Sequence, residues 1–185
     1  AIDELYNKAF PPTGTDTIID LVSSNPDELY TDEHGDIRYY GANPNNYVRF
    51  NNELWRIMGV IDGKIKIVRN ASIGDYARNS SSSNNWNNSS LKSYLNGDYY
   101  NSIEEVSRNM IASETYYLGG STSGNYRTLT ASGWYNAERD STQVYSGNRT
   151  STTQYIGLMY PSDYGYAAGE SCLSKALSSS DSSCT

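Results

Sequence analysis

The sequence predicts an α+β fold: an antiparallel β-meander core with short helices and long surface loops. Three observations predict this class. Period-two patterning over residues 47–68 predicts three consecutive strands. Helix-like patterns follow over residues 89–95 and 102–113. Irregular, Gly-rich sequence then runs from residue 118 to residue 153, and loops of that length in a compact domain are usually functional or disordered.

The meander is the most strongly predicted element. Tyr47–Phe50 is joined by Asn51-Asn52 to Glu53–Val60, and Asp62-Gly63 joins that run to Lys64–Val68. A two-residue Asp-Gly step between alternating runs is the strongest short-range signal for a hairpin. We therefore expect three antiparallel strands with an apolar face that anchors the fold.

The N-terminal part is expected to be separate from the meander. Residues 1–24 read as a helical segment that Pro11-Pro12 interrupts, and residues 25–185 read as a single α+β domain. Turn residues at Asp32–Asp36 precede the first strand of the meander. The expected order is thus a short helical lead followed by one domain.

Two helices are expected after the meander. Ser89 or Asn88 provides a cap for a short helix that Asn96-Gly97 ends. Ser102 and Glu105 have capping-box spacing, which predicts a second helix as far as Ser113.

The remaining elements are predicted from short apolar runs. Residues 134–135 and 144–145 read as strand-like pieces, and residues 155–160 read as a buried strand that ends at Pro161. A short helix is expected at residues 173–177. These runs lie among Ser, Asn, Thr and Gly residues, so most of the C-terminal half is predicted to be loop.

The charge balance excludes some partners. The chain has 14 Lys and Arg against 21 Asp and Glu, a net charge of -7. Such a surface repels phosphate backbones and anionic lipid, so we expect neither nucleic acid nor membrane insertion. The sequence has no transmembrane segment, and because it opens on Ala1 we expect a product whose export signal has been removed.

Two cysteines indicate the compartment. Cys172 and Cys184 lie close together in a Ser-rich stretch, and the single histidine, His34, is far away in sequence. We expect a disulfide rather than a two-thiol metal site, and hence an oxidising, secreted or cell-surface location. Closing a loop of this size is worth roughly 3 kcal/mol in the chain-entropy model.

Four motifs in combination resemble a known family: Asn43–Phe50, Leu54–Val60, Trp86–Asn96 and Ile156–Ala167. They are similar to an uncharacterised extracellular domain of Gram-positive gut bacteria, found behind prepilin-like leaders or inside large surface proteins. The match covers most of residues 25–184. It implies a location and a layout similar to C-type-lectin-like and sulfatase-modifying-factor domains, but no reaction. The family usually continues past its second Cys with two further strands, whereas this sequence ends at Thr185.

Catalytic and metal motifs are scarce. No phosphate loop, nucleophile elbow or His-x-x-x-His motif is present, so we predict no catalytic residues and no metal ligands. Calcium is the one alternative cofactor, at Asp32, Glu33 and Asp36 or at Asp163 and Glu170, although ordinary turn chemistry accounts for both groups.

A binding surface is predicted from tyrosine usage. The chain has 18 Tyr against 2 Phe and 3 Trp, and many of these rings lie among amide and hydroxyl side chains. Sugar rings stack on such aromatic faces while amides hydrogen-bond to their hydroxyls, and protein paratopes use the same mixture. The predicted ligand-binding residues are Trp86, Trp134, Tyr116, Tyr117, Tyr126 and Tyr135.

These observations favour a non-enzymatic, adhesin-like binding module that recognises glycan or protein on a bacterial surface or pilus-associated protein. Two alternatives stay open: a structural subunit that self-assembles into a filament or stalk, and an extracellular hydrolase. A subunit would polymerise at raised concentration, an adhesin would bind a ligand as a monomer, and a hydrolase would need a cleft with opposed carboxylates.

Overall fold

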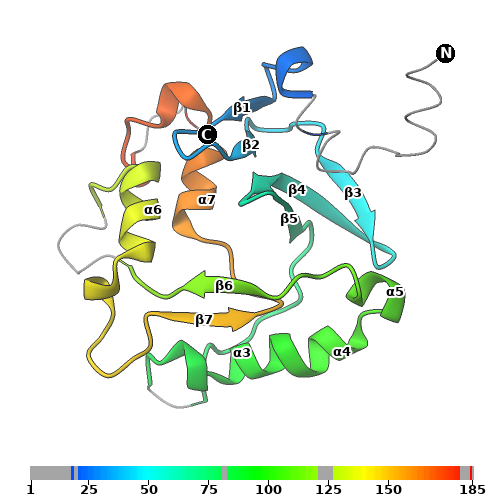
Figure 1. Ribbon diagram of the computed structural model, residues 1–185, viewed down its shortest axis with the longest axis vertical. Coiled ribbons are helices and arrows are strands. Elements are labelled where there is room, and N and C mark those ends of the chain that lie inside the picture. The colour runs from blue at the N-terminus through cyan, green and yellow to red at the C-terminus, as the bar shows by residue number, and fades with distance from the viewer. Residues whose placement is uncertain (1–17, 19–20, 81–82, 121–126, 180–183, 185) are drawn as a thin grey trace.

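Figure 1 shows the computed structural model of the chain, which describes residues 18, 21–80, 83–120, 127–179 and 184. The predicted N-terminal helical segment falls largely outside these residues, although Ile18 and residues 21–24 are helical. The larger sheet has five strands: β1 (Leu29–Thr31), β2 (Ile37–Tyr39), β3 (Tyr47–Phe50), β4 (Glu53–Ile61) and β5 (Lys64–Arg69). The α+β class is confirmed, because short helices and a second antiparallel sheet accompany this one.

The predicted meander is confirmed as β3, β4 and β5. Both connections are two-residue turns with positive φ angles, 51° and 59° at Asn51-Asn52 and 49° and 73° at Asp62-Gly63. Such turns match the natural twist of the strands that they join. Central strand β4 pairs with β5 along one edge and with both β3 and β2 along the other.

The strands β1 and β2 were not predicted. They flank the Asp32–Asp36 turn and continue the sheet beyond β4, with Ile37 opposite Val60 and Arg38 opposite Gly59. Gly59 is required there because a Cβ atom at this position would overlap the carbonyl group of Ile37. Close approach of two backbones therefore fixes how β2 joins the meander.

One helical run follows the sheet and is longer than predicted. After η1 (Trp86–Asn88), the chain is helical through α3 (Ser90–Tyr94), the π-helical η2 (Leu95–Tyr99) and α4 (Tyr100–Ser102). Ser89 caps it as expected, by accepting a hydrogen bond from the Lys92 amide. The prediction that the helix ends at Asn96-Gly97 is wrong. The Asn96 side chain donates hydrogen bonds to the carbonyls of Lys92 and Ile156, and these bonds stabilise the helical conformation there.

The second predicted helix is reduced to α5 (Glu105–Arg108). Its expected cap, Ser102, instead donates to the carbonyl of Tyr99 within the preceding helix. Val106 and Met110 are 76% and 74% exposed, so two residues of the apolar stripe that predicted a helix as far as Ser113 are not buried. Without burial, so short a segment gains little from being helical.

The C-terminal half builds a small second sheet and two helices. Its elements are β6 (Glu114–Tyr117), α6 (Ala131–Arg139), η3 (Ser141–Gln143), β7 (Ser151–Gln154), α7 (Pro161–Tyr166) and η4 (Glu170–Cys172). Figure 1 shows β6 and β7 between α7 on one side and α3 on the other. The strand predictions at 134–135, 144–145 and 155–160 are wrong, as is the helix at 173–177.

Local hydrogen bonds explain two of these differences. Residues 134–135 belong to α6, whose first turn is capped by the Thr130 hydroxyl accepting from the Gly133 amide. The amides of Tyr155 and Ile156 donate to the side chain of Asn96, which ends strand pairing there. The Asn96 side chain thus accepts the hydrogen bonds that a neighbouring strand would otherwise accept.

The disulfide is confirmed. Cys172 and Cys184 are bonded, with their Cα atoms 5.7 Å apart, and Cys172 is buried. Within the described chain, no helix has both the length and the apolar character needed to cross a bilayer. The disulfide is compatible with a secreted protein.

Two small cores support these layers. The first packs one face of the larger sheet and contains Ile18, Leu29, Ile37, Tyr39 and Val60. The second joins β1 to α6 and α7 through Tyr30, Ala131 and Tyr166. Between them lies a buried group of charged side chains.

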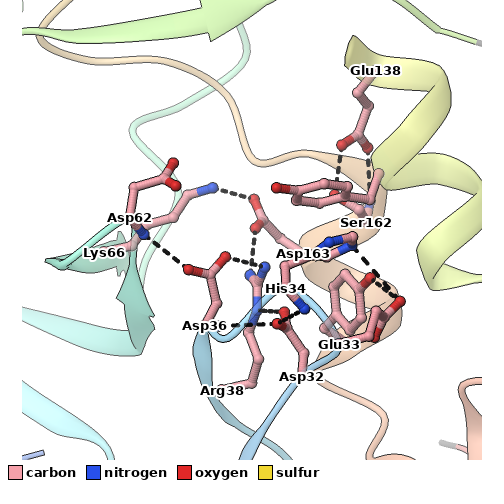
Figure 2. Close-up of polar contacts among 12 residues, drawn as sticks. Asp32, Glu33, His34, Asp36, Arg38, Asp62, Lys66, Glu138, Ser162 and Asp163 are labelled. Carbon is pink, nitrogen blue, oxygen red and sulfur yellow. Dashed lines mark hydrogen bonds and ion pairs between the residues drawn. The ribbon is translucent and has the colours of Figure 1, made fainter. Parts of the chain in front are cut away.

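Arg38 is the centre of that group. It is 3% exposed, and its guanidinium contacts Asp32 at 2.9 Å and Asp36 and Asp163 at 3.3 Å each. Lys66 of β5 donates to the other oxygen of Asp163 at 2.6 Å. Figure 2 shows these carboxylates converging on Arg38 from the β1–β2 turn and from α7. The cluster therefore joins the larger sheet to the C-terminal half.

A second buried pair lies beside it. Glu138 of α6 accepts hydrogen bonds from the amide of Ser162 at 2.8 Å and from its hydroxyl at 2.6 Å. Burial raises the pKa of the Glu138 carboxyl, while the hydrogen bonds from Ser162 oppose that rise. Glu138 thus attaches α6 to the first turn of α7.

The two sheets do not join. No backbone hydrogen bond between β5 and β6 is found in the part of the chain that the structure describes, so each strand keeps one unpaired edge. A cavity of about 470 Å³ is lined by Lys64–Ile67 of β5 and Glu114–Tyr117 of β6. Because successive strand side chains point to opposite faces, a cavity lined by four consecutive residues of each strand runs along the strand edges.

Replacing Arg38 tests the charged cluster. Arg38→Leu leaves the buried Asp32 and Asp36 without their positive partner, so the free energy of unfolding should fall by about 3–5 kcal/mol. Urea unfolding measures this value. The matched control is Arg49→Leu on the exposed part of β3, which should change it by less than about 0.5 kcal/mol. Equal effects of the two changes would contradict a central role for Arg38.

Glu138→Gln tests the buried pair through its pH dependence. A carboxyl whose pKa is raised by folding stabilises the fold fully below its ordinary pKa of 4.5, and this contribution is lost as the pH rises through the folded value. Gln keeps the shape without titrating. The stability of the variant relative to the original should therefore increase as the pH rises above 4.5, measured by thermal unfolding. Glu105→Gln on exposed α5 controls for the lost charge, and a relative stability that falls with rising pH would contradict the assignment.

Candidate functional site

A groove of about 390 Å³ is the best candidate for a binding site. It forms where η1, β6 and the end of β7 meet the loop after η3 and the segment before α7. Five aromatic side chains line it: Trp86, Tyr116, Tyr117, Tyr145 and Tyr160. Five amide side chains accompany them: Asn84, Asn85, Gln143, Asn148 and Gln154. Aromatic faces beside convergent amides are the lining expected for a ligand rich in hydroxyl groups.

Trp86 is held in a fixed orientation at one wall. It begins η1, which Asn85 caps by accepting from the amide of Asn87. The indole Nε1 donates to Oε1 of Gln154 at 2.9 Å, and Gln154 in turn donates to the carbonyl of Ile156 at 3.0 Å. Gln154 is only 4% exposed, so it acts as a rigid support that presents the ring to the groove.

Tyr160 lines the groove beside Tyr117 of β6. Its hydroxyl accepts from the amide of Tyr117 at 2.6 Å and donates to the carbonyl of the same residue at 3.1 Å. The hydroxyl thus satisfies both backbone groups that Tyr117 presents at the free edge of β6. Burial raises the pKa of Tyr160, so the phenol stays protonated and can make both bonds.

Tyr116 is packed more deeply than its neighbour. Its ring lies 6.3 Å from that of Tyr160, and burial raises its pKa. Tyr117 is 39% exposed, with the Arg139 guanidinium 5.1 Å from its ring centroid. One tyrosine therefore forms the floor of the groove and the other forms part of its rim.

Polar contacts connect the loops around the groove. Asn148 donates to the side chain of Asn84 at 3.1 Å, and so joins the segment before η1 to the segment before β7. Arg78 donates to the carbonyls of Asn84 and Ser83, each at 2.8 Å. These bonds fix loop residues that lie far apart in the sequence.

The structure brings three of the six predicted ligand residues together. Trp86, Tyr116 and Tyr117 line the groove, whereas Trp134 and Tyr135 lie on α6 outside its lining. Tyr135 stacks on His34 with ring centroids 3.8 Å apart. Tyr126, the sixth residue, falls outside the described residues.

Several lining residues were missed. Tyr160 lies in a run predicted to be a buried strand, and Arg78 and Arg149 lie in stretches read as polar loop. Trp86 and Gln154 are 68 residues apart, so their bond depends wholly on how the second sheet packs. The local signal near residues 143–160 was weak: three Tyr residues and the two Gln residues of the chain lie there.

The buried charged residues of Figure 2 are a poorer candidate for a site. Glu138 and Ser162 have the spacing of a base and a nucleophile, yet each is only 2% exposed. The carboxylates of Asp32, Asp36 and Asp163, all three considered above as calcium ligands, already bind the Arg38 guanidinium. Across the described residues, no group of three or more His, Cys, Asp or Glu side chains has an arrangement that could hold a metal ion.

An apolar cavity of about 440 Å³ lies on the other side of Tyr116. Trp55 and Ile67 of the larger sheet line it together with Leu91 and Leu95 of the helical run. Trp55 thus faces the space between the layers rather than a closed core. Its Nε1 is buried and makes no hydrogen bond to any described residue.

Comparison with known proteins gives one result. A family described as a domain of unknown function, DUF6273, matches residues 62–148. This span includes Trp86, Tyr116 and Tyr117, and it ends before β7 and α7. No curated protein and no solved structure showed a significant match. The chain therefore contains a DUF6273 match whose description assigns no activity, and the layout similar to C-type-lectin-like domains stays a prediction.

Gly157→Ala tests the packing of the groove floor. A Cβ atom at Gly157 would overlap the ring of Tyr116 and lie 2.8 Å from Nε2 of Gln154. The ring must then move, and we expect the free energy of unfolding to fall by about 1–3 kcal/mol. Gly97→Ala is the control, because nothing lies within 4 Å of its Cβ position inside the helical run; it should stabilise by up to about 1 kcal/mol. Chemical unfolding compares the two, and an unchanged Gly157→Ala protein would show that the floor is loosely packed.

Proposed function

We propose that this chain is a non-enzymatic, extracellular domain that binds glycans through the groove beside β6. The observation that carries the proposal is the convergence of Trp86, Tyr117 and Tyr160 with five amide side chains in one groove. Aromatic rings stack on the apolar faces of sugars, and amides both donate to and accept from sugar hydroxyls. Neither group requires a cofactor.

The walls support binding by a rigid site. The Trp86 indole is oriented by buried Gln154, and the Tyr160 ring is fixed by two bonds to the backbone of Tyr117. A preorganised site loses less side-chain entropy when a ligand binds. Such rigidity favours recognition of a defined shape.

The lining supports binding rather than hydrolysis. Its described residues include no Asp, Glu, His or Cys. Cleavage of a glycosidic bond usually requires two opposed carboxyl groups, one as acid and one as base or nucleophile. The amides and tyrosines of this groove do not supply that pair.

The location is proposed from the disulfide and from the sequence resemblance. A disulfide between Cys172 and Cys184 persists in oxidising compartments and is rare in the cytosol. The resemblance to bacterial surface domains adds that the chain is displayed on a Gram-positive cell or a pilus-associated protein. We infer that its ligand is a glycan presented by a host or a neighbouring cell.

Trp86→Ala tests the site directly. Purified protein is applied to an array of neutral and acidic glycans and mucins, with and without calcium, and hits are titrated by calorimetry. Loss of the stacking ring should weaken binding at least about tenfold. Trp134→Ala is the control, because it removes the same side chain from outside the groove. An equal loss of glycan binding in both variants, or unchanged binding by Trp86→Ala, would refute the assignment of the binding site to the groove.

The same samples address assembly. Sedimentation at rising concentration measures self-association with the fold intact. A chain that binds no glycan and polymerises would favour the structural-subunit alternative over the binding domain. A monomer that binds would support the proposal.

A further inference from the structure

The charge of the groove differs from that of the protein. The chain carries 21 acidic and 14 basic residues, a net charge of -7. The described lining of the groove nevertheless includes two arginines, Arg78 and Arg149, and no carboxylate. The described lining of the groove is therefore more positive than the protein as a whole.

Neither arginine is neutralised by a carboxylate of the described chain. The ion pairs of the described acids involve other cations, among them Arg38, Lys64, Lys66, Arg69, Arg139 and His34. Arg78 instead donates to two backbone carbonyls, through Nη1 and Nη2. A guanidinium has five N–H donors, so Arg78 is held in place with three donors left for a ligand.

A third positive charge lies behind the groove. Lys92 donates to the side chains of Asn87 at 2.9 Å and Thr152 at 2.7 Å, and makes no ion pair with a described acid. Burial lowers the pKa of Lys92, and the nearby charge of Arg149 lowers it further. Positive charges that repel one another without a counter-ion are stabilised when an anion arrives.

We propose that the groove selects acidic glycans, meaning short oligosaccharides that carry a carboxylate or a sulfate group. The aromatic walls hold the sugar ring, and Arg78 and Arg149 hold the anion. A guanidinium suits this role because its planar N–H groups bind two oxygens of a carboxylate or sulfate at once. The net charge of -7 excludes extended polyanions, so the ligand presents an isolated acidic group. This inference rests on the glycan-binding function proposed above.

The test compares lactose with two acidic derivatives, and it also compares sialyllactose with its neutral methyl ester so that the carboxylate is tested separately from the added sugar. Lactose, sialyllactose and lactose sulfated at the same position are titrated into the purified chain at low and high salt. The two acidic sugars distinguish carboxylate from sulfate, and we expect at least one to bind about tenfold or more tightly than lactose at low salt. The preference should shrink at high salt because screening weakens charge interactions.

Two double variants with the same change in net charge separate local from general electrostatics. Arg78→Gln with Arg149→Gln should abolish the preference for the acidic sugars over lactose. Arg49→Gln with Arg108→Gln, at arginines outside the lining, should keep the preference. Circular dichroism and thermal unfolding confirm that each variant is folded.

The outcomes distinguish the two proposals. If all three sugars bind equally and Trp86→Ala abolishes that binding, the groove binds glycans and charge selection is refuted. If the preference survives in the Arg78 and Arg149 variant, or is lost equally in the control variant, the assignment to these arginines is refuted. If none of these sugars and no glycan of the array binds, the glycan-binding function itself fails.

Discussion

The fold depends on one buried cation. Arg38 lies almost wholly out of water and is surrounded by carboxylates from the β1–β2 turn and from α7. Desolvating these charges is costly, and only their mutual contacts and hydrogen bonds offset that penalty. The arrangement is therefore satisfied only when β2, β5 and α7 are all in place, which makes the larger sheet and the C-terminal half dependent on each other.

The same cluster positions the groove through a short chain of contacts. Asp163 accepts a hydrogen bond from the amide of Tyr160 at 3.0 Å, and so fixes the start of α7. The Tyr160 hydroxyl then holds Tyr117 at the edge of β6. Asp163 and Tyr160 thus connect the buried charges around Arg38 to the wall of the groove. These contacts hold the groove wall in a fixed position relative to the buried charges.

The sequence predicted those elements whose conformation depends on residues that are neighbours in the chain. The turns at Asn51-Asn52 and Asp62-Gly63 have residues that accept positive φ, so the meander could be predicted. Strand β7 could not, because Ser151–Gln154 contains no apolar residue and reads as loop, yet Thr152 and Gln154 are buried by their bonds to Lys92 and Trp86. Three of the five aromatic residues that line the groove could be predicted as ligand contacts, because Trp86, Tyr116 and Tyr117 carry their chemistry in their side chains. Their grouping with Arg149 and Tyr160 depends on packing between distant segments, which no local pattern contains.

The unpaired edges of β5 and β6 affect how readily this chain would aggregate with other chains. An unpaired strand edge can form hydrogen bonds with a strand of another chain, and here two such edges line the cavity between β5 and β6. Three features obstruct an intruding strand. Lys64 and Lys66 would have to lose bound water or their ion-pair partners. The Lys64–Glu114 ion pair, at 3.1 Å, joins β5 to β6 across the cavity. The Tyr160 hydroxyl already bonds to the backbone of Tyr117. Each raises the free energy of strand insertion, so the fold carries its own protection against edge-to-edge aggregation.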